Sequence, residues 1–449
     1  MAEPLIFHID VNSAFLSWEA AYRKMTQPDA VDLREIPSVI GGNEATRHGI
    51  VLAKSPSAKK YGIRTGEPLA KARQKCPNLV VAPPHYSLYV ENSRRFIELL
   101  KKYAPVVEQY SIDEAFCDMT GTGKLYGDPV AFAHQLKDEI YDSFGFTVNI
   151  GISDKKLLAK MASDFEKPNK VHTLFSAEVP SKLWPLPVEE LFTVGKSTAA
   201  RLRILGIRTI GDLARMDPEL IKAHLKKHGE VIWNYANGND DSKVASESAA
   251  SKSYGNSITI PQDVTDRETA QTILLSLCET VGARIRADKA YIGVVSVSIV
   301  DSDFHQSSIQ ETLDTATNVT ETIYETACRL FDRLWKGAPI RLLNVSTSHP
   351  TSDSYAQVQL FGQEKLEKLT KLNSAIDQIR DRFGEDSIKR ARFVKVSDPN
   401  AADAPSKLTH MTGGIGKSKR DARNQNKKNV QDAFGAQNGD TDVSDHGCR

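Results

Sequence analysis

Apolar and polar positions in the first part of the chain predict an alternation of strands and helices. The run LIFHIDV at residues 5–11 is apolar enough for a buried strand, and FTVNIGIS at 146–153 alternates like a second strand. Residues 87–103 carry apolar side chains at helical spacing, which predicts an amphipathic helix. Further strands are expected within 36–54, 105–111 and 114–119, and further helices at 13–24, 129–143 and 155–165.

The pattern changes after residues 167–169 (KPN). Residues 187–235 contain short helical segments separated by glycine turns, and the polar stretch 238–252 lacks periodicity, which predicts a linker. A second α/β block follows at 253–349, in the order strand, helix, strand, strand, helix, strand. Beyond residue 395 the chain is rich in Asn, Lys, Asp and Gly and poor in apolar residues, so a disordered tail is expected.

The composition fits a soluble globular protein and restricts how the chain can bind nucleic acid. It has 449 residues, 40% of them hydrophobic and 26% charged, with a net charge of +1. This length suggests roughly three or four domains, and affinity for nucleic acid must come from local clusters of cations. The five cysteines form no CxxC pair, which argues against structural zinc and a disulfide framework. Neither a signal peptide nor an apolar run of about 20 residues is visible, so a cytoplasmic location is expected.

Two adjacent carboxylates, Asp113 and Glu114, interrupt the apolar run YSIDEAFCDM. Neighbours on a strand point to opposite faces, and a buried carboxylate is costly unless it is paired or binds a metal. Asp10 ends the first predicted strand, so central strands of one sheet can bring the three acids together. Phosphoryl-transfer enzymes use such a group to hold two divalent metals about 3.5–4 Å apart. Ordinary salt bridges or strand-end caps explain the same spacing.

Basic residues cluster in one segment of the first block. The segment 53–75 contains Lys54, Lys59, Lys60, Arg64, Lys71, Arg73 and Lys75. A solvated helix face explains such a run, and a triphosphate also requires several cations in one place. Lys167 precedes a proline at the end of a predicted helix, and it matters only if that helix delivers it to the carboxylates.

Two further segments are candidates for binding macromolecules. Residues 191–214 read as helix, glycine turn, helix, and backbone N–H groups at Gly195, Lys196 and Ser197 can hold a DNA phosphate without reading bases. A plain helical hairpin is the alternative. The peptide YAQVQLFGQEK at 355–365 is either an edge strand or a docking motif whose anchors are Gln357, Leu360 and Phe361.

Together these segments resemble the Y-family, or translesion, DNA polymerases of the bacterial polymerase IV and polymerase V type. The resemblance covers about residues 4–365. It rests on HIDVNSAFLSWE, YSIDEAFCD and ISDKKLLAKMASDFEKPN, on the hairpin segment 191–214, and on KSYGNSIT, VSIVDSDF and PIRLLNVS in the second block. Several independent motifs in the family's order make a chance match improbable.

The resemblance implies an α/β (α+β) multidomain fold shaped like a right hand. The expected parts are a palm at 1–25 and 78–166, fingers at 26–77, a helical thumb at 167–237, a linker at 238–252, an α/β little finger at 253–350, a clamp-binding peptide at 351–365 and a disordered tail at 395–449. The implied activity is low-fidelity, template-directed translesion synthesis on primer–template DNA with dNTPs, by a monomer that docks on a sliding clamp.

The resemblance also assigns residue roles. Asp10, Asp113, Glu114 and the Val11 carbonyl are expected to hold two Mg²⁺ ions, and Phe15 is expected to exclude the ribose 2′-OH. Nucleotide and DNA contacts are expected from Lys59, Lys167, Gly195, Lys196, Ser197 and Lys252, with Arg284 and Arg286 as further cations in the little finger. The chain departs from the family pattern at Asn12, where many members have Asp, and at Pro56 and Lys59, where many have Tyr and Arg.

Two rival functions stay open at the level of the sequence. A catalytically inactive family member would act as an adaptor for DNA or a sliding clamp, although retention of three mutually repelling carboxylates argues against it. A nucleotide cyclase uses similar two-metal carboxylates, but the hairpin segment and QVQLF have no place in one.

Overall fold

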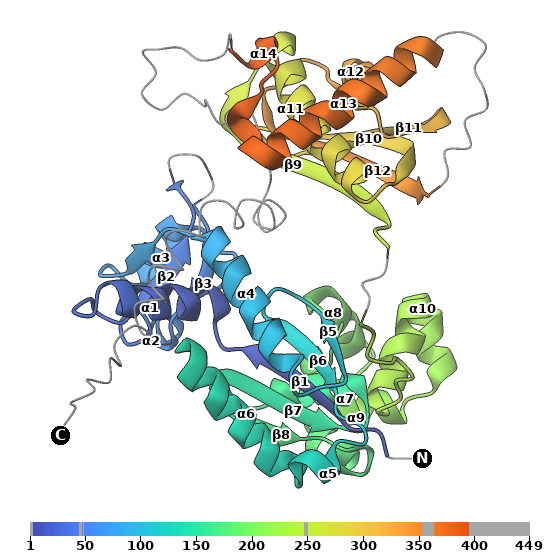
Figure 1. Cartoon of the computed structure of the whole chain (residues 1–449). Helices are drawn as coiled ribbons and strands as arrows, with labels where there is room; N and C mark the ends of the chain where they lie inside the picture. The colour runs from blue at the N-terminus through green and yellow to red at the C-terminus, as the bar shows by residue number, and fades with distance from the viewer. Residues whose placement is uncertain (1–2, 45–46, 48, 247–249, 353–362, 395–449) are drawn as a thin grey trace, which may run out of the picture. The chain divides into compact units, whose positions relative to one another are not determined.

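The protein is described here by a computed structural model that covers residues 3–44, 47, 49–246, 250–352 and 363–394. The core of the predicted docking peptide (Gln357, Leu360 and Phe361) and the tail from 395 lie outside these residues. Contacts divide the chain into two units (Figure 1). The first comprises Met1–Ile40, Leu52–Thr65 and Lys75–Ser248, and the second comprises Gly41–Val51, Gly66–Gln74 and Ala249–Arg449.

A five-stranded sheet forms the centre of the first unit, in the order β5-β6-β1-β7-β8. Its strands are β1 (Ile6–Val11), β5 (Val106–Gln109), β6 (Glu114–Asp118), β7 (Val148–Ser153) and β8 (Val171–Thr173). The central strand β1 is buried along its whole length and pairs antiparallel with β6 and β7. The strands predicted at 5–11, 105–111, 114–119 and 146–153 are therefore confirmed.

Helices cover both faces of this sheet (Figure 1). On one face, α1 (Ala14–Thr26), α4 (Tyr86–Leu100) and α6 (Pro129–Phe144) pack against the odd-numbered residues of β1. On the other, α7 (Lys156–Ser163) packs so closely that a Cβ at Gly151 would lie 2.0 Å from the Ala159 carbonyl oxygen. The even-numbered residues of β1, which include Asp10, face α7. The short helix α5 (Gly123–Tyr126) precedes α6.

A small sheet and two short helices lie between residues 38 and 82. The sheet has the order β3-β2-β4, with β2 (Ser38–Gly41), β3 (Val51–Lys54) and β4 (Val80–Ala82). The strands predicted within 36–54 are thus β2 and β3. The basic segment forms α2 (Pro56–Lys60) and α3 (Leu69–Lys75). Ser55 caps α2, because its side chain accepts the Ala58 N–H at 3.0 Å.

The segment predicted as short helices has its own apolar core. Helical turns at Ser176–Glu178, Val179–Leu183 and Val188–Glu190 lead into α8 (Lys196–Ile204), α9 (Ile210–Arg215) and α10 (Pro218–Ala236). Helix α10 is kinked at Lys226, whose φ of 57° and ψ of −141° are not helical. Gly229 follows the kink, where a Cβ would lie 2.6 Å from the Ile221 carbonyl oxygen.

The second unit contains a four-stranded antiparallel sheet, ordered β11-β10-β12-β9. The strands are β9 (Ser253–Val264), β10 (Tyr291–Asp301), β11 (Gln306–Thr317) and β12 (Ile340–Thr351), and α11 (Arg267–Ala287) and α12 (Thr320–Leu334) share one apolar core with them. The predicted order of elements in this block is confirmed. None of the described helices combines the length and the apolar character needed to span a membrane.

Helix α13 (Gln363–Phe383) was not predicted from the sequence, and it is followed by a turn at Glu385–Ser387 and by α14 (Ala391–Val394). Buried ion pairs join this segment to α11. Arg380 pairs with Glu279 at 3.2 Å, and Asp377 accepts from Arg286 Nε at 2.6 Å. Arg286, which we expected to be available to DNA, is therefore engaged inside the protein.

The kink in α10 leads to a stability prediction. A non-glycine residue in this backbone region costs about 1–3 kcal/mol, so we expect Lys226→Gly to raise the free energy of unfolding by roughly 1 kcal/mol after the extra chain entropy of glycine is subtracted. Thermal unfolding measures the change. Lys227→Gly is the control, because Lys227 has helical backbone geometry and should lose about 1 kcal/mol. Equal losses in both variants would contradict the strain argument.

Candidate active site

Two of the three predicted carboxylates are direct neighbours across the sheet. Asp10 on β1 is in register with Glu114 on β6, and the Val11 N–H donates to the Asp113 carbonyl at 3.0 Å. Ser111 shapes the turn before β6. Its hydroxyl donates to Asp113 Oδ1 at 2.6 Å and accepts the Glu114 N–H at 3.1 Å. The sheet thus brings the three acids to one end of β1 and β6.

Asp10 is bound to a lysine and is nevertheless hard to ionise. Its side chain forms an ion pair with Lys167, which also contacts Asp164 at 2.8 Å. Burial raises the pKa of Asp10 to about 6, because the attraction of Lys167 offsets part of the desolvation only. Burial acts to lower the pKa of Lys167, but its two acidic partners outweigh it and raise that pKa.

Glu114 has the opposite electrostatic balance. Lys160 Nζ lies 2.8 Å from its Oε2, and His8 Nε2 lies 3.5 Å from the same oxygen. Burial acts to raise the pKa of Glu114, but the His8 and Lys160 contacts outweigh it and hold the pKa at about 2. His8 is itself buried, which lowers its pKa, and its Nδ1 lies 2.7 Å from Ser163 Oγ.

The side chain of Asn12 orders the turn that presents Lys167. Its Oδ1 accepts the Asn169 N–H at 2.9 Å and its Nδ2 donates to Asn149 Oδ1 at 3.2 Å. Asn149 in turn donates to the Glu166 carbonyl at 2.7 Å. An amide both donates and accepts, whereas an ionised carboxylate only accepts. The departure at Asn12 therefore has a structural role in this chain.

One cavity of about 440 Å³ joins the predicted catalytic and nucleotide contacts. Its lining includes Asp10, Val11, Phe15, Lys59, Asp113 and Lys167, and also Asn12, Lys54, Pro56 and Thr65. Phe15 is held in place by Tyr89, whose ring stacks on it with centroids 4.6 Å apart. In the sequence, Lys54 stood out only as one charge in a basic run. Its position at the end of β3, where alternate residues share a face, was the signal that could have placed it here.

None of the predicted DNA contacts is among the residues that line this cavity. Gly195 is the N-cap of α8, which begins with Lys196 and Ser197, so the predicted turn is present at the helix start. Lys252 immediately precedes β9 in the second unit. The structure assigns no ligand to either place.

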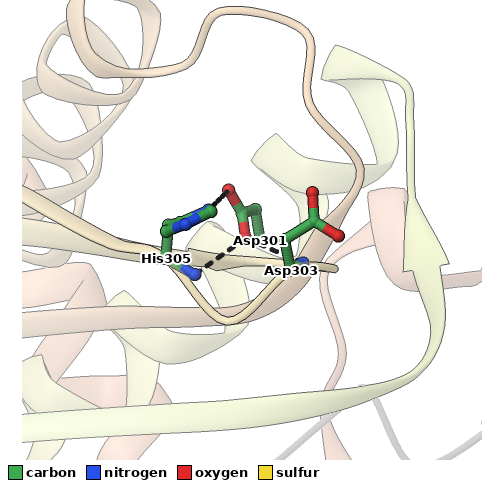
Figure 2. Close-up of side chains that lie close together, drawn as sticks. All are labelled: Asp301, Asp303 and His305. Carbon is green, nitrogen blue, oxygen red and sulfur yellow. Dashed lines mark hydrogen bonds and ion pairs between the residues drawn. The ribbon is translucent and has the colours of Figure 1, made fainter.

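A different group of residues has three possible metal-ligand atoms close together. Within the described part of the chain, three ligand atoms that all lie within 4.8 Å of one another occur at Asp301, Asp303 and His305 (Figure 2). Hydrogen bonds explain this cluster as a turn between β10 and β11, because Asp301 Oδ1 accepts the N–H groups of Asp303 and His305, each at 2.9 Å. The ligand atoms of Asp10, Asp113 and Glu114 do not meet this distance limit.

The three acids still fit a divalent cation chemically. Carboxylate and carbonyl oxygens are the ligands of hard cations such as Mg²⁺, and Asp10, Asp113 and the Val11 backbone border one cavity. Lys160 binds Glu114 at Oε2, which is also the oxygen that His8 approaches, and Lys167 likewise binds Oδ2 of Asp10. A cation therefore binds either the other oxygen of each carboxylate or the same oxygen after it has displaced the lysine.

Comparisons with known proteins agree with the motifs. The chain matches the impB/mucB/samB family over residues 9–164, the C-terminal domain of that family over 251–360, and the IMS family HHH motif over 176–207. It is 45% identical to DNA polymerase IV of Clostridium acetobutylicum over 392 residues, which are 87% of this chain and 98% of that protein. It is 36% identical to DNA polymerase IV 2 of Bacillus subtilis, covering 87% and 95% of the two chains.

A solved structure supports the fold alone. The Y-family DNA polymerase chimera Dbh-Dpo4(243-245)-Dbh superposes with a TM-score of 0.66 at 23% sequence identity. The match covers 78% of this chain and 100% of that one. The predicted α/β multidomain fold is therefore confirmed.

The contrast between Asp10 and Glu114 predicts opposite stability effects in metal-free protein. Above pH 6, Asp10 is ionised in both the folded and the unfolded state, so Asp10→Asn removes the burial cost that Lys167 leaves uncompensated and should stabilise by on the order of 2 kcal/mol. This gain should shrink as the pH falls below about 6 and should vanish only well below 3.8, where the acid is protonated in both states. Glu114→Gln should destabilise above about pH 4.5, with the loss fading toward pH 2.

Thermal unfolding in EDTA at pH 8 and at pH 4.5 tests both signs. Each variant is the control for the other, because both replace one carboxylate of a register pair by its amide. Destabilisation by Asp10→Asn at pH 8 would contradict the assigned cost of burial.

Proposed function

This chain belongs to the impB/mucB/samB family, that is, to the Y-family DNA polymerases, and we propose that it extends a primer on a template strand across DNA damage. The reaction is attack of the primer 3′-OH on the α-phosphate of a dNTP, with release of pyrophosphate. The observation that supports it best is the single cavity that combines Asp10 and Asp113 with Phe15, Lys59 and Lys167. Relatives named DNA polymerase IV give no support to the inactive-adaptor alternative.

We assign the acids and the Val11 carbonyl to binding divalent cations, with two Mg²⁺ ions as the expected number. When bound, such ions activate the attacking hydroxyl and stabilise charge on the phosphates. Asp10 and Asp113 border the cavity directly, and Glu114 lies in register with Asp10. Ser111 keeps the Asp113 side chain in one orientation through its 2.6 Å hydrogen bond.

The lysines and Phe15 are assigned to the incoming nucleotide. Lys59 and Lys167 supply two positive charges on the cavity wall, where a triphosphate requires them. A lysine makes a point-charge contact rather than the two-pronged contact of an arginine, and Pro56 offers no hydroxyl. The Phe15 ring, fixed by its stack on Tyr89, is assigned to exclude a ribose 2′-OH.

Contacts with larger partners complete the proposal. The N–H groups at Gly195, Lys196 and Ser197 and the charge of Lys252 are assigned to the DNA backbone, so binding should weaken with salt. The peptide with Gln357, Leu360 and Phe361 is assigned to a sliding clamp, which would raise the effective concentration of the enzyme at the primer end. We expect the protein to act as a monomer in the cytoplasm.

Primer extension tests the assigned reaction. We expect Asp113→Ala to reduce single-dNTP incorporation with Mg²⁺ by at least about 10³-fold, since a lost metal ligand removes several kcal/mol of transition-state stabilisation. Asp118→Ala is the matched control, because Asp118 ends β6, the strand that follows Asp113, and accepts the Thr120 N–H instead of lining the cavity. Extension that survives Asp113→Ala would show that the metal site is elsewhere.

Sugar discrimination tests the role of Phe15. We expect Phe15→Val to lower the ratio of dNTP to NTP incorporation by at least about tenfold, corresponding to about 1.4 kcal/mol of lost discrimination. The rate with dNTP should change less, because the ring contacts the sugar rather than the phosphates. A ratio unchanged from wild type, measured with matched dNTP and NTP on one template, would remove the assignment.

A further inference from the structure

We propose that Lys160 is a positioning residue for the metal site, which holds Glu114 by one oxygen and directs the other toward a divalent cation. This inference rests on the proposed function and adds a residue to it. Lys160 lies on α7, outside the cavity lining, and acts through Glu114 rather than by touching substrate.

The contact between Lys160 and Glu114 is short and largely shielded from water. Lys160 Nζ lies 2.8 Å from Glu114 Oε2, and the two side chains are 11% and 22% exposed. His8 approaches the same oxygen, at 3.5 Å. Two neighbours on Oε2 leave Oε1 as the oxygen that a cation can bind without displacing either of them.

Lys160 is itself held on several sides. Its ammonium lies 5.5 Å from the Tyr110 ring and 5.5 Å from the Phe192 ring, within the range of cation–π attraction. Its helix cannot shift inward, because Gly151 already brings β7 against the α7 backbone. The Lys160 carbonyl also accepts the Ser163 hydroxyl at 2.8 Å.

Loss of this contact has two predicted consequences for Glu114. The side chain regains rotamer freedom, which must be lost again when a metal binds. Its charge also loses a neutralising partner while Asp10 remains beside it in register. Outer residues that orient a metal-binding side chain are typically worth about 10–100-fold in metal affinity.

Lys156 provides a closely matched control on the same helix. Its Nζ binds Glu108 at 2.7 Å, the two side chains are 14% and 19% exposed, and the ammonium lies 4.7 Å from the Phe116 ring. Glu108 is not one of the three acids assigned to the cation, and it also accepts the Ala245 N–H at 2.8 Å. Lys156→Met therefore removes a similar half-buried ion pair without touching the metal candidates.

The test measures Mn²⁺ binding to the full chain in complex with primer–template and dNTP. The primer ends in a dideoxynucleotide, so it has no 3′-OH and the complex cannot react. We expect Lys160→Met to weaken Mn²⁺ binding by about 10–100-fold, and Lys160→Arg to recover most of the loss because it restores the charge. Lys156→Met should remain within about twofold of wild type. The Mg²⁺ concentration for half-maximal primer extension should rise in Lys160→Met alone.

The possible results separate this inference from the proposed function. If wild type binds Mn²⁺ and extends primers but Lys160→Met matches Lys156→Met, the role of Lys160 is overturned and the polymerase assignment stands. Failure of Lys160→Arg to recover binding overturns it as well. A wild-type complex that neither binds Mn²⁺ nor extends a primer overturns both.

Discussion

The structure of the site depends on the cost of placing like charges on adjacent central strands. Asp10 and Glu114 are register partners between β1 and β6, and Asp10 is 8% exposed. Each acid has to lose water and bear the field of the other. Two lysines from one short stretch of chain offset part of this cost, because Lys160 binds Glu114 and Lys167 binds Asp10. The two lysine side chains thus hold the acids of the assigned metal site in place.

The surrounding scaffold serves to deliver those two lysines. Gly151 allows α7 to lie against the sheet, which carries Lys160 to Glu114. Asn12 and Asn149 bind the backbone of the turn after α7, which fixes Lys167 next to Asp10. The two acids are left in different states. Asp10 has a raised pKa of about 6, and Glu114 has a lowered pKa of about 2. A bound divalent ion would favour the ionised form of both.

The second unit also pairs buried charges, and there the pairs join helices to one another. Glu279 is buried within α11 and is matched by Arg380 and Arg390 from the C-terminal segment. Arg286 is likewise committed to Asp377. These ion pairs hold α13 and α14 against the sheet domain, so several charges that look available in the sequence are structural. Positive charge for DNA must come from residues that lack such internal partners.

The sequence by itself determined most of the elements up to β12, their order and the family of the chain. Apolar periodicity placed β1, β6, β7 and α4 within a few residues, since alternation along a strand or helix is local. The family motifs then drew attention to the acids, Phe15 and Lys167, which the fold brings together around one end of β1. Tertiary structure alone decided which charges meet. The lysine that binds Glu114 lies 46 residues away in the chain, and α13 contacts α11 across more than 80 residues. Such pairings depend on strand register and helix packing over long separations, which no local pattern encodes.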